Sequence, residues 1–148
     1  MGLGGGRVHT YQIGDRWESR GRTITESDLV MFSALSGDWY PLHTDQEWAS
    51  KTRYGQRIAH GMLVLSVATG LMVFKPGIVL AFYGLDRTRF VRPTYIGDTV
   101  HVELEVQALQ DKKALGGVVT SLMQVVKHTG EVVVNGHFKI LVAKAGAT

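Results

Sequence analysis

The sequence predicts a single α+β domain in which one long apolar helix is covered by an antiparallel sheet. The apolar run over 58–74 is typical of a helix that is buried on most sides. Three later segments, 98–109, 118–127 and 131–142, carry the patterns of long strands. Because the helix precedes these strands instead of alternating with them, the order favours a helix segregated to one face of the sheet.

The length and the N-terminal sequence set the expected domain limits. The chain has 148 residues, which is enough for one domain with a core of its own. Residues 1–9 begin with a glycine-rich stretch and are predicted to be a flexible tail. They contain no apolar segment of the kind that a secretory signal requires. The domain itself is expected to span 10–148.

The first elements are predicted to be short. Residues 11–24 have the composition of an opening strand region with turn signals inside it. Thr25 followed by Asp28 predicts a helix N-terminus, and we expect this helix to run to Ser36 and to end at Gly37. The apolar positions at helical spacing are Leu29, Phe32 and Leu35. A second short helix is predicted over 45–50, with Thr44 as its N-cap.

The run over 58–74 is apolar nearly all round, apart from Ser66 and Thr69. It falls short of the ~20 apolar residues that a bilayer span requires, and it contains His60. We therefore expect a buried helix and no membrane partner.

The strands that should cover this helix follow it. Segment 98–109 alternates strictly, which predicts a half-buried strand. Its expected inward positions are Val100, Val102, Leu104, Val106 and Ala108. The strands over 118–127 and 131–142 should form a hairpin at 128–130, and the segments 79–83 and 85–91 supply further strand.

Composition excludes several chemistries. The chain has no cysteine, so disulfides, thiolate metal sites and cysteine nucleophiles are excluded. This composition fits a reducing compartment, and we expect a cytoplasmic location. The six histidines show no metal-ligand spacing, and we expect neither a metal ion nor another cofactor.

The formal net charge is only +3, but basic residues gather on both sides of the apolar helix. The two groups are Lys51, Arg53 and Arg57, and Arg87, Arg89 and Arg92. A solvated surface is the common explanation of such groups, and no nucleic-acid-binding motif accompanies them. We therefore expect no nucleic acid partner.

Asp38 and His43 lie five residues apart in a stretch punctuated by glycine and proline. A loop held between helices can direct both side chains to one point, and together they supply a carboxylate and an imidazole for proton transfer. A turn residue and a surface histidine are the structural alternative. Gly61 stands at the expected start of the long helix, where free backbone N–H groups suit a developing oxyanion.

Three blocks of sequence carry a family resemblance. Gly-Asp-Trp-Tyr-Pro-Leu-His over 37–43 resembles the Gly-Asp-x-Asn-Pro-x-His signature of the MaoC-like dehydratases, which include the (R)-specific enoyl-CoA hydratases. Segments 57–62 and 90–99 resemble the second and third blocks of the same family, and the similarity covers roughly 10–142. Tyr40 departs from the pattern, because the family usually has Asn at this position.

The resemblance implies a hotdog fold, in which a curved antiparallel sheet wraps one long central helix. It also implies reversible water addition to a trans-2-enoyl thioester of coenzyme A or acyl carrier protein, giving an (R)-3-hydroxyacyl thioester. In this scheme Asp38 accepts a proton from water, His43 holds the same water and passes a proton to C2, and the Gly61 N–H forms the oxyanion hole. The family further implies a homodimer, or a dimer of two such dimers.

Four further residues are assigned to substrate binding. Tyr40 is expected to reshape the pocket, and Trp39 to form part of its wall. His60 and Met62 lie at the expected helix start, where packing in the core is the alternative role and the favoured one for each. Two other functions stay open: a hotdog acyl-CoA thioesterase and a non-catalytic acyl-thioester-binding subunit.

Overall fold

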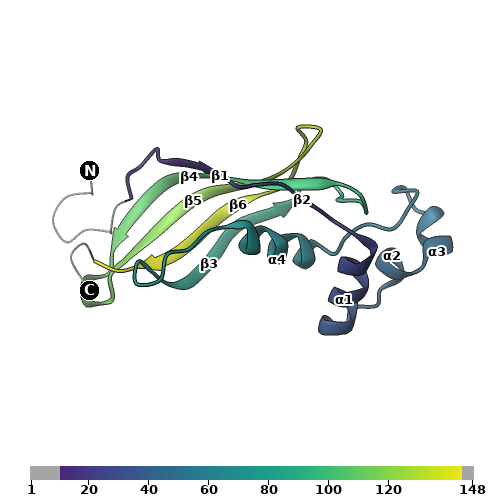
Figure 1. The fold of residues 1–148 in the computed structure, drawn as a ribbon, viewed down its shortest axis with the longest axis horizontal. Helices are drawn as coiled ribbons and strands as arrows, with labels where there is room; N and C mark the ends of the chain where they lie inside the picture. The colour runs from purple at the N-terminus through teal and green to yellow at the C-terminus, as the bar shows by residue number, and fades with distance from the viewer. Residues whose placement is uncertain (1–10, 145–148) are drawn as a thin grey trace.

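The computed structural model describes residues 11–144, and the predicted tail over 1–9 lies outside this range. The chain begins with two short strands and three helices, continues with a central helix, and ends with four long strands (Figure 1). The elements are β1 Arg16–Glu18, β2 Arg22–Thr23, α1 Glu26–Ser36, α2 Pro41–Thr44, α3 Gln46–Ser50, α4 Gly61–Leu71, β3 Val79–Phe90, β4 Thr99–Asp111, β5 Gly117–Lys127 and β6 Val132–Val142. A short 3₁₀ turn, Lys113–Leu115, lies between β4 and β5.

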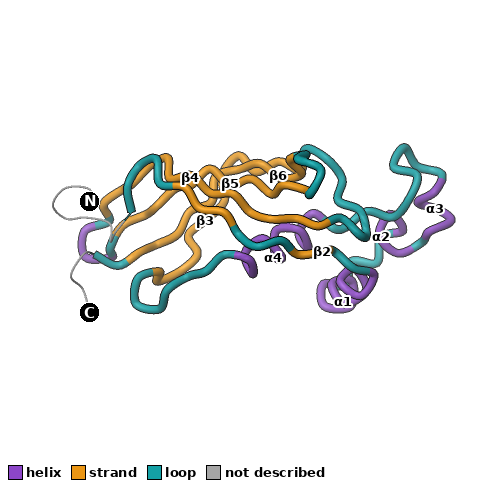
Figure 2. The backbone as a smooth tube through the Cα atoms, turned by 45° about the horizontal axis from the view of Figure 1, so that its top comes forward, coloured by secondary structure: helices purple, strands orange, loops and turns teal. Residues whose placement is uncertain are grey.

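The strands form one antiparallel sheet in the order β1-β4-β5-β6-β3, with β2 also paired to β4. Helix α4 lies against one face of this sheet, while α1, α2 and α3 lie beyond one end of it (Figures 1 and 2). The core forms between α4 and the sheet, and its members include Leu63, Ala68, Val102, Met123 and Phe138. The predicted α+β layout, with the helix on one face, is confirmed.

Helix α4 is shorter than the predicted 58–74, because tertiary pairing sets its start. Ile58 forms an isolated antiparallel bridge with Tyr95, and the Ala59 N–H donates to the Thr94 carbonyl at 2.7 Å. These extended residues cannot also be helical, so the helix starts only at Gly61. Within the described residues, no helix has both the length and the apolar content needed to cross a membrane.

The local signals around α1 are confirmed. The Thr25 hydroxyl accepts from the Asp28 N–H, and the Asp28 carboxylate accepts from the Thr25 N–H, which makes a capping box. Gly37 ends the helix with a φ of 78°, a left-handed conformation that glycine adopts without a Cβ penalty. The inward face differs from the prediction, since Leu35 is exposed and Ser33 is buried.

Two further details correct the sequence-based expectations. The N-cap of α3 is Asp45, whose side chain accepts from the Trp48 N–H; the Thr44 hydroxyl donates instead to the Trp39 and Tyr40 carbonyls. In β4 the pairing with β5 shifts between Val106 and Ala108. Such a bulge moves the following side chains to the other face, so Ala108 is exposed.

Strand β3 lies at an edge of the sheet and carries a row of exposed apolar side chains. These are Leu80, Phe82, Tyr83, Leu85 and Phe90. A long, apolar, unpaired edge invites association with another strand.

Candidate active site

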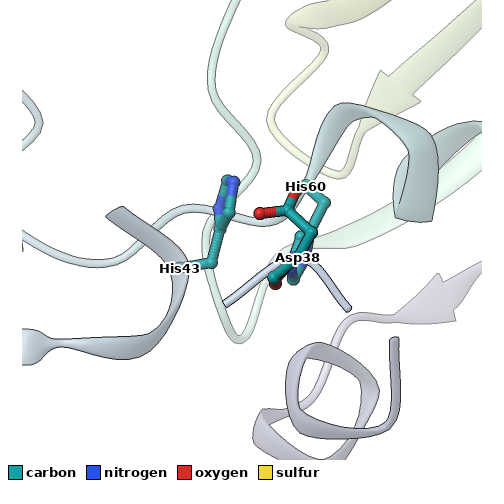
Figure 3. Close-up of side chains that lie close together, drawn as sticks. All are labelled: Asp38, His43 and His60. Carbon is teal, nitrogen blue, oxygen red and sulfur yellow. Dashed lines mark hydrogen bonds between the residues drawn. The ribbon is translucent and has the colours of Figure 1, made fainter. Parts of the chain in front are cut away.

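Asp38, His43 and His60 converge at the N-terminal end of α4 (Figure 3). Asp38 comes from the loop after α1, His43 from α2, and His60 from the residue that precedes α4. One side-chain nitrogen of each histidine and a carboxylate oxygen of Asp38 all lie within 4.8 Å of one another. The structure therefore brings together the Asp38–His43 pair that the spacing predicted, with His60 beside it.

His43 is oriented by a backbone group. Its Nδ1 lies 2.8 Å from the Ile58 carbonyl oxygen, and the Ile58 N–H donates in turn to the Leu42 carbonyl at 3.2 Å. A carbonyl oxygen only accepts, so Nδ1 carries the proton in this contact. The Nε2 atom of His43 is thereby left for chemistry.

The segment that carries the Ile58 carbonyl pairs with a loop that contains a buried ion pair. Ile58 bridges Tyr95, whose N–H donates to the Asp98 carboxylate at 2.7 Å. The same carboxylate lies 2.8 Å from Lys127 Nζ, and the two side chains are only 16% and 6% exposed. Lys127 Nζ also lies over the Tyr95 ring, 4.9 Å from its centroid. This pair joins the β3–β4 connection, through Asp98, to the end of β5, through Lys127, and it lies next to the segment that orients His43.

Asp38 follows the left-handed Gly37 and is exposed. Its Oδ1 accepts from the Tyr40 N–H at 3.2 Å, which is a local turn contact, and its own N–H donates to the Ser36 hydroxyl. One carboxylate oxygen therefore orients the side chain, and the other remains for a proton or a water. Figure 3 shows one carboxylate oxygen of Asp38 directed toward His43.

His60 is 2% exposed, and its ring stacks on that of His43 with centroids 3.9 Å apart and planes at 26°. Its Nε2 lies 3.0 Å from the Ser33 hydroxyl and 3.2 Å from the Asp38 carbonyl oxygen. Burial is the main cause that lowers the pKa of the His60 imidazole, and the nearby His43 lowers this pKa further. His60 is therefore a neutral ring behind His43.

The stacking of the His43 and His60 rings indicates whether the two histidines could bind one metal ion together. The lone pairs of an imidazole lie in the plane of its ring, and metal ligands direct such lone pairs at a common point. Two nearly parallel rings do not converge in this way. The arrangement fits proton transfer better than metal ligation.

Gly61 opens α4 beside this cluster. The first N–H groups of a helix have no partner within it, so they present donors and the positive end of the helix dipole. A Cβ at position 61 would come within 2.8 Å of the Phe90 ring, so a larger residue here would displace that exposed ring. Gly61 and His43 line a cleft of about 430 Å³.

Most of the other cleft residues were not singled out as binding residues from the sequence. Met62 also lines the cleft, whereas the other site residues named from the sequence, Asp38, Trp39, Tyr40 and His60, are not part of its lining. The remaining lining residues are Arg53, Tyr54, Ile58, Ala59, Val64, Phe90, Val91, Arg92, Pro93, Thr94, Val133 and Val134. Arg53 and Arg92 come from the two basic groups that flank the apolar run. This clustering was the one feature of the sequence that could have indicated residues lining the cleft.

Tyr40 has a defined place next to the cluster. It is the N-cap of α2, and its ring lies edge-on to His43 at 6.2 Å and to Trp48 at 5.6 Å between centroids. The side chain that replaces the family's Asn thus contacts the catalytic candidate from the solvent side.

Comparison with known proteins places these residues in a family. Residues 10–128 match the model of the MaoC like domain. Protein MaoC of Klebsiella aerogenes is 41% identical over 107 residues, which are 66% of this chain and 32% of that protein. This chain therefore spans about a third of the length of that relative. The (R)-specific enoyl-CoA hydratase of Rhodospirillum rubrum is 33% identical over 131 residues, which are 86% of each chain.

Solved structures agree with the predicted fold. A protein from Archaeoglobus described as a monoamine oxidase regulatory protein superposes with a TM-score of 0.87 at 41% identity, covering 92% of this chain and 93% of its own. A Mycobacterium tuberculosis protein described as a double hotdog fold gives a TM-score of 0.80 at 19% identity, over 93% of this chain and 44% of its own. The predicted hotdog fold is confirmed.

Proposed function

Because this chain belongs to the MaoC-like family of hydratases and dehydratases, we propose that it adds water reversibly to a trans-2-enoyl thioester, giving an (R)-3-hydroxyacyl thioester. The observation that carries the proposal is the approach of the Asp38 carboxylate to His43 beside the start of α4. This is the arrangement that a conjugate addition needs: groups that move protons next to donors that stabilise an enolate.

The protons balance if the ring of His43 carries both of its protons before water attacks. Asp38 accepts a proton from water as the oxygen bonds to C3. His43 then gives its Nε2 proton to C2, while Nδ1 keeps its own proton on the Ile58 carbonyl. Asp38 finally returns a proton to His43 Nε2, which restores both groups. When water attacks C3, the electron pair of the C2=C3 bond is delocalised onto the thioester oxygen as an enolate. The same pair then forms the new C2–H bond.

The Gly61 N–H is proposed to stabilise the thioester oxygen while it carries negative charge. It lies at the positive end of α4 and lines the same cleft as His43. Arg53 and Arg92 line this cleft as well, and their guanidinium groups suit the phosphates of coenzyme A or of a carrier protein. Met62 is proposed to contact the acyl portion.

One experiment separates this function from its alternatives. Purified protein is incubated with a panel of enoyl-CoA esters, while loss of the conjugated-thioester absorbance and release of free thiol are followed together. Hydration removes the absorbance and releases no thiol, whereas a thioesterase releases thiol. Binding of the esters without either signal identifies a non-catalytic acyl-thioester-binding subunit.

We further propose that the protein is a homodimer joined through β3, with a dimer of dimers as the larger form. Light scattering at micromolar concentration is expected to give twice the mass of one chain, because the exposed apolar edge of β3 calls for a partner. Leu80→Lys on this edge is expected to give monomers. Leu35→Lys, an exposed apolar position on α1, is the matched control and should remain dimeric. A monomeric mass for the unaltered protein contradicts the proposal.

Tyr40 is proposed to set substrate preference. Because its ring lies against both His43 and Trp48, Tyr40→Asn removes bulk beside the catalytic groups. We expect the ratio of kcat/KM for long and short enoyl esters to change by about tenfold, with little change in the melting temperature. Equal relative rates across the panel in both proteins would show that Tyr40 does not determine specificity.

A further inference from the structure

We propose that His60, held in place by Ser33, is a positioning residue that ties the two catalytic segments together; this inference rests on the proposed function. His60 contacts both members of the pair, but in different ways. Its ring face covers the ring of His43, and its Nε2 reaches the backbone of Asp38. With 2% exposure it has no surface to offer a substrate.

The direction of the hydrogen bonds follows from the partners. The Asp38 carbonyl oxygen only accepts, so the 3.2 Å contact is satisfied when His60 Nε2 carries the proton. The Ser33 hydroxyl, 3.0 Å from the same nitrogen, can accept as well. Nε2–H is thus shared between the loop that carries Asp38 and the buried side of α1. Rotation of the ring about its bond to Cβ would break both contacts.

The other ring nitrogen shows that packing alone does not explain His60. Its Nδ1 is buried and has no hydrogen-bond partner among the described residues. A buried polar atom without a partner destabilises the fold, and a hydrocarbon side chain would avoid this cost. An imidazole at this position is therefore best explained by what Nε2 and the ring face do for Asp38 and His43.

Ser33 is likewise a polar residue at a buried position. It is fully buried on α1, where the helical spacing of apolar residues does not require a hydroxyl. Its hydroxyl bonds the residue before α4, next to the Phe32 ring of the same helix, whose centroid lies 4.9 Å from that of His60. The imidazole ring of His60, which immediately precedes α4, therefore contacts both α1 and the Asp38 loop. A displacement of a catalytic group by about 1 Å can lower a rate by about 100-fold, so such a fixed point affects turnover.

Two substitutions at position 60 separate the two contacts. His60→Gln keeps an amide donor near Nε2 and loses the ring that stacks on His43. His60→Phe keeps a ring and loses the donor to Asp38. Both variants are expected to lower kcat for enoyl-CoA hydration by about 10- to 100-fold. KM should be unchanged, because neither the ring face nor Nε2 of His60 touches the substrate. Ser33→Ala is expected to lower kcat less, because the contact with Asp38 remains.

A spectroscopic signal tests the same idea without turnover. The Nδ1–H proton of His43 is observable by 1H–15N NMR while its bond to the Ile58 carbonyl slows exchange with water. We expect this signal in the unaltered protein and in His60→Phe, and we expect it to be lost in His60→Gln, where the stacked ring is missing. The controls are His101→Gln, on the β4 face away from α4, and Ser50→Ala, on the exposed side of α3; both should match the unaltered protein.

Three results overturn the inference. The first is unchanged kcat in folded His60→Gln and His60→Phe. The second is a loss of kcat that follows the unfolded fraction measured by thermal melts, which indicates a structural role. The third is a raised KM at constant kcat, which indicates substrate contact. If the unaltered protein turns over no enoyl ester, the proposed function fails, and the His43 signal still decides whether His60 positions that ring.

Discussion

Asp38→Asn is expected to lower hydration turnover by about 10²–10⁴-fold while the protein stays folded, because a positioned acid or base contributes a factor of this size. Asn keeps the oxygen that accepts from the Tyr40 N–H, so the loop geometry is retained and only proton acceptance is lost. His43→Asn is expected to have an effect of the same order. Its amide can still donate to the Ile58 carbonyl, but it has no counterpart of Nε2.

The double variant is expected to be barely slower than either single variant, since groups that share one water act as a unit. Turnover and thermal melts should be measured on all three variants. If Asp38 and His43 were only a turn residue and a surface histidine, activity would follow the folded fraction instead. Full activity in well-folded Asp38→Asn protein would falsify the assignment of the base.

The largest loss of stability is expected at the buried Asp98–Lys127 pair. Lys127→Met keeps the length of the side chain but leaves the Asp98 carboxylate buried without its counter-charge. Removal of one partner of a buried pair lowers the free energy of unfolding by about 3–5 kcal/mol. Urea unfolding at a fixed protein concentration measures this difference, and the double variant Asp98→Asn/Lys127→Met should lose less than the sum of the two single variants.

The matched control is Arg16→Met, which breaks the Arg16–Glu105 pair between β1 and β4. This pair is at the surface, so its loss should change stability far less than the loss of the buried pair. Because Tyr95 links Asp98 to Ile58, we also expect Lys127→Met to slow turnover at temperatures where the protein is still folded. Equal stability of Lys127→Met and the unaltered protein would contradict the importance of the pair.

Signals that act over a few residues predicted the fold well. The capping residues Thr25 and Asp28 and the glycine at 37 determine α1 through contacts within one or two turns, so the sequence contains all the information needed. The strands β4, β5 and β6 were predictable because one face of each is buried. Four-residue helix α2 was missed, since Pro41 is as typical of a loop as of a first helical position.

Features decided by tertiary pairing were not predictable. Ile58 is as apolar as the helix that follows it, and only its bridge to Tyr95 excludes it from α4. The bulge before Ala108 depends on the pairing of two strands. The same holds at the site: Asp38 and His43 form a recognisable motif, whereas the carbonyl that orients His43 is a backbone group with no sequence signature. Ser33 was missed because helical spacing placed Leu35, not a serine, on the inner face.

The position of α4 in the chain has a consequence for how the protein is made. Every strand that buries this apolar helix is synthesised after it, and the sheet is complete only when β6 has paired with both β5 and β3. Synthesis proceeds at about 5–20 residues per second, so α4 leaves the ribosome seconds before its cover exists. Folding also needs pairing between β1 and β4, which are distant along the chain, and such pairing is slow. The nascent chain therefore exposes this apolar helix until the β5–β6 hairpin emerges.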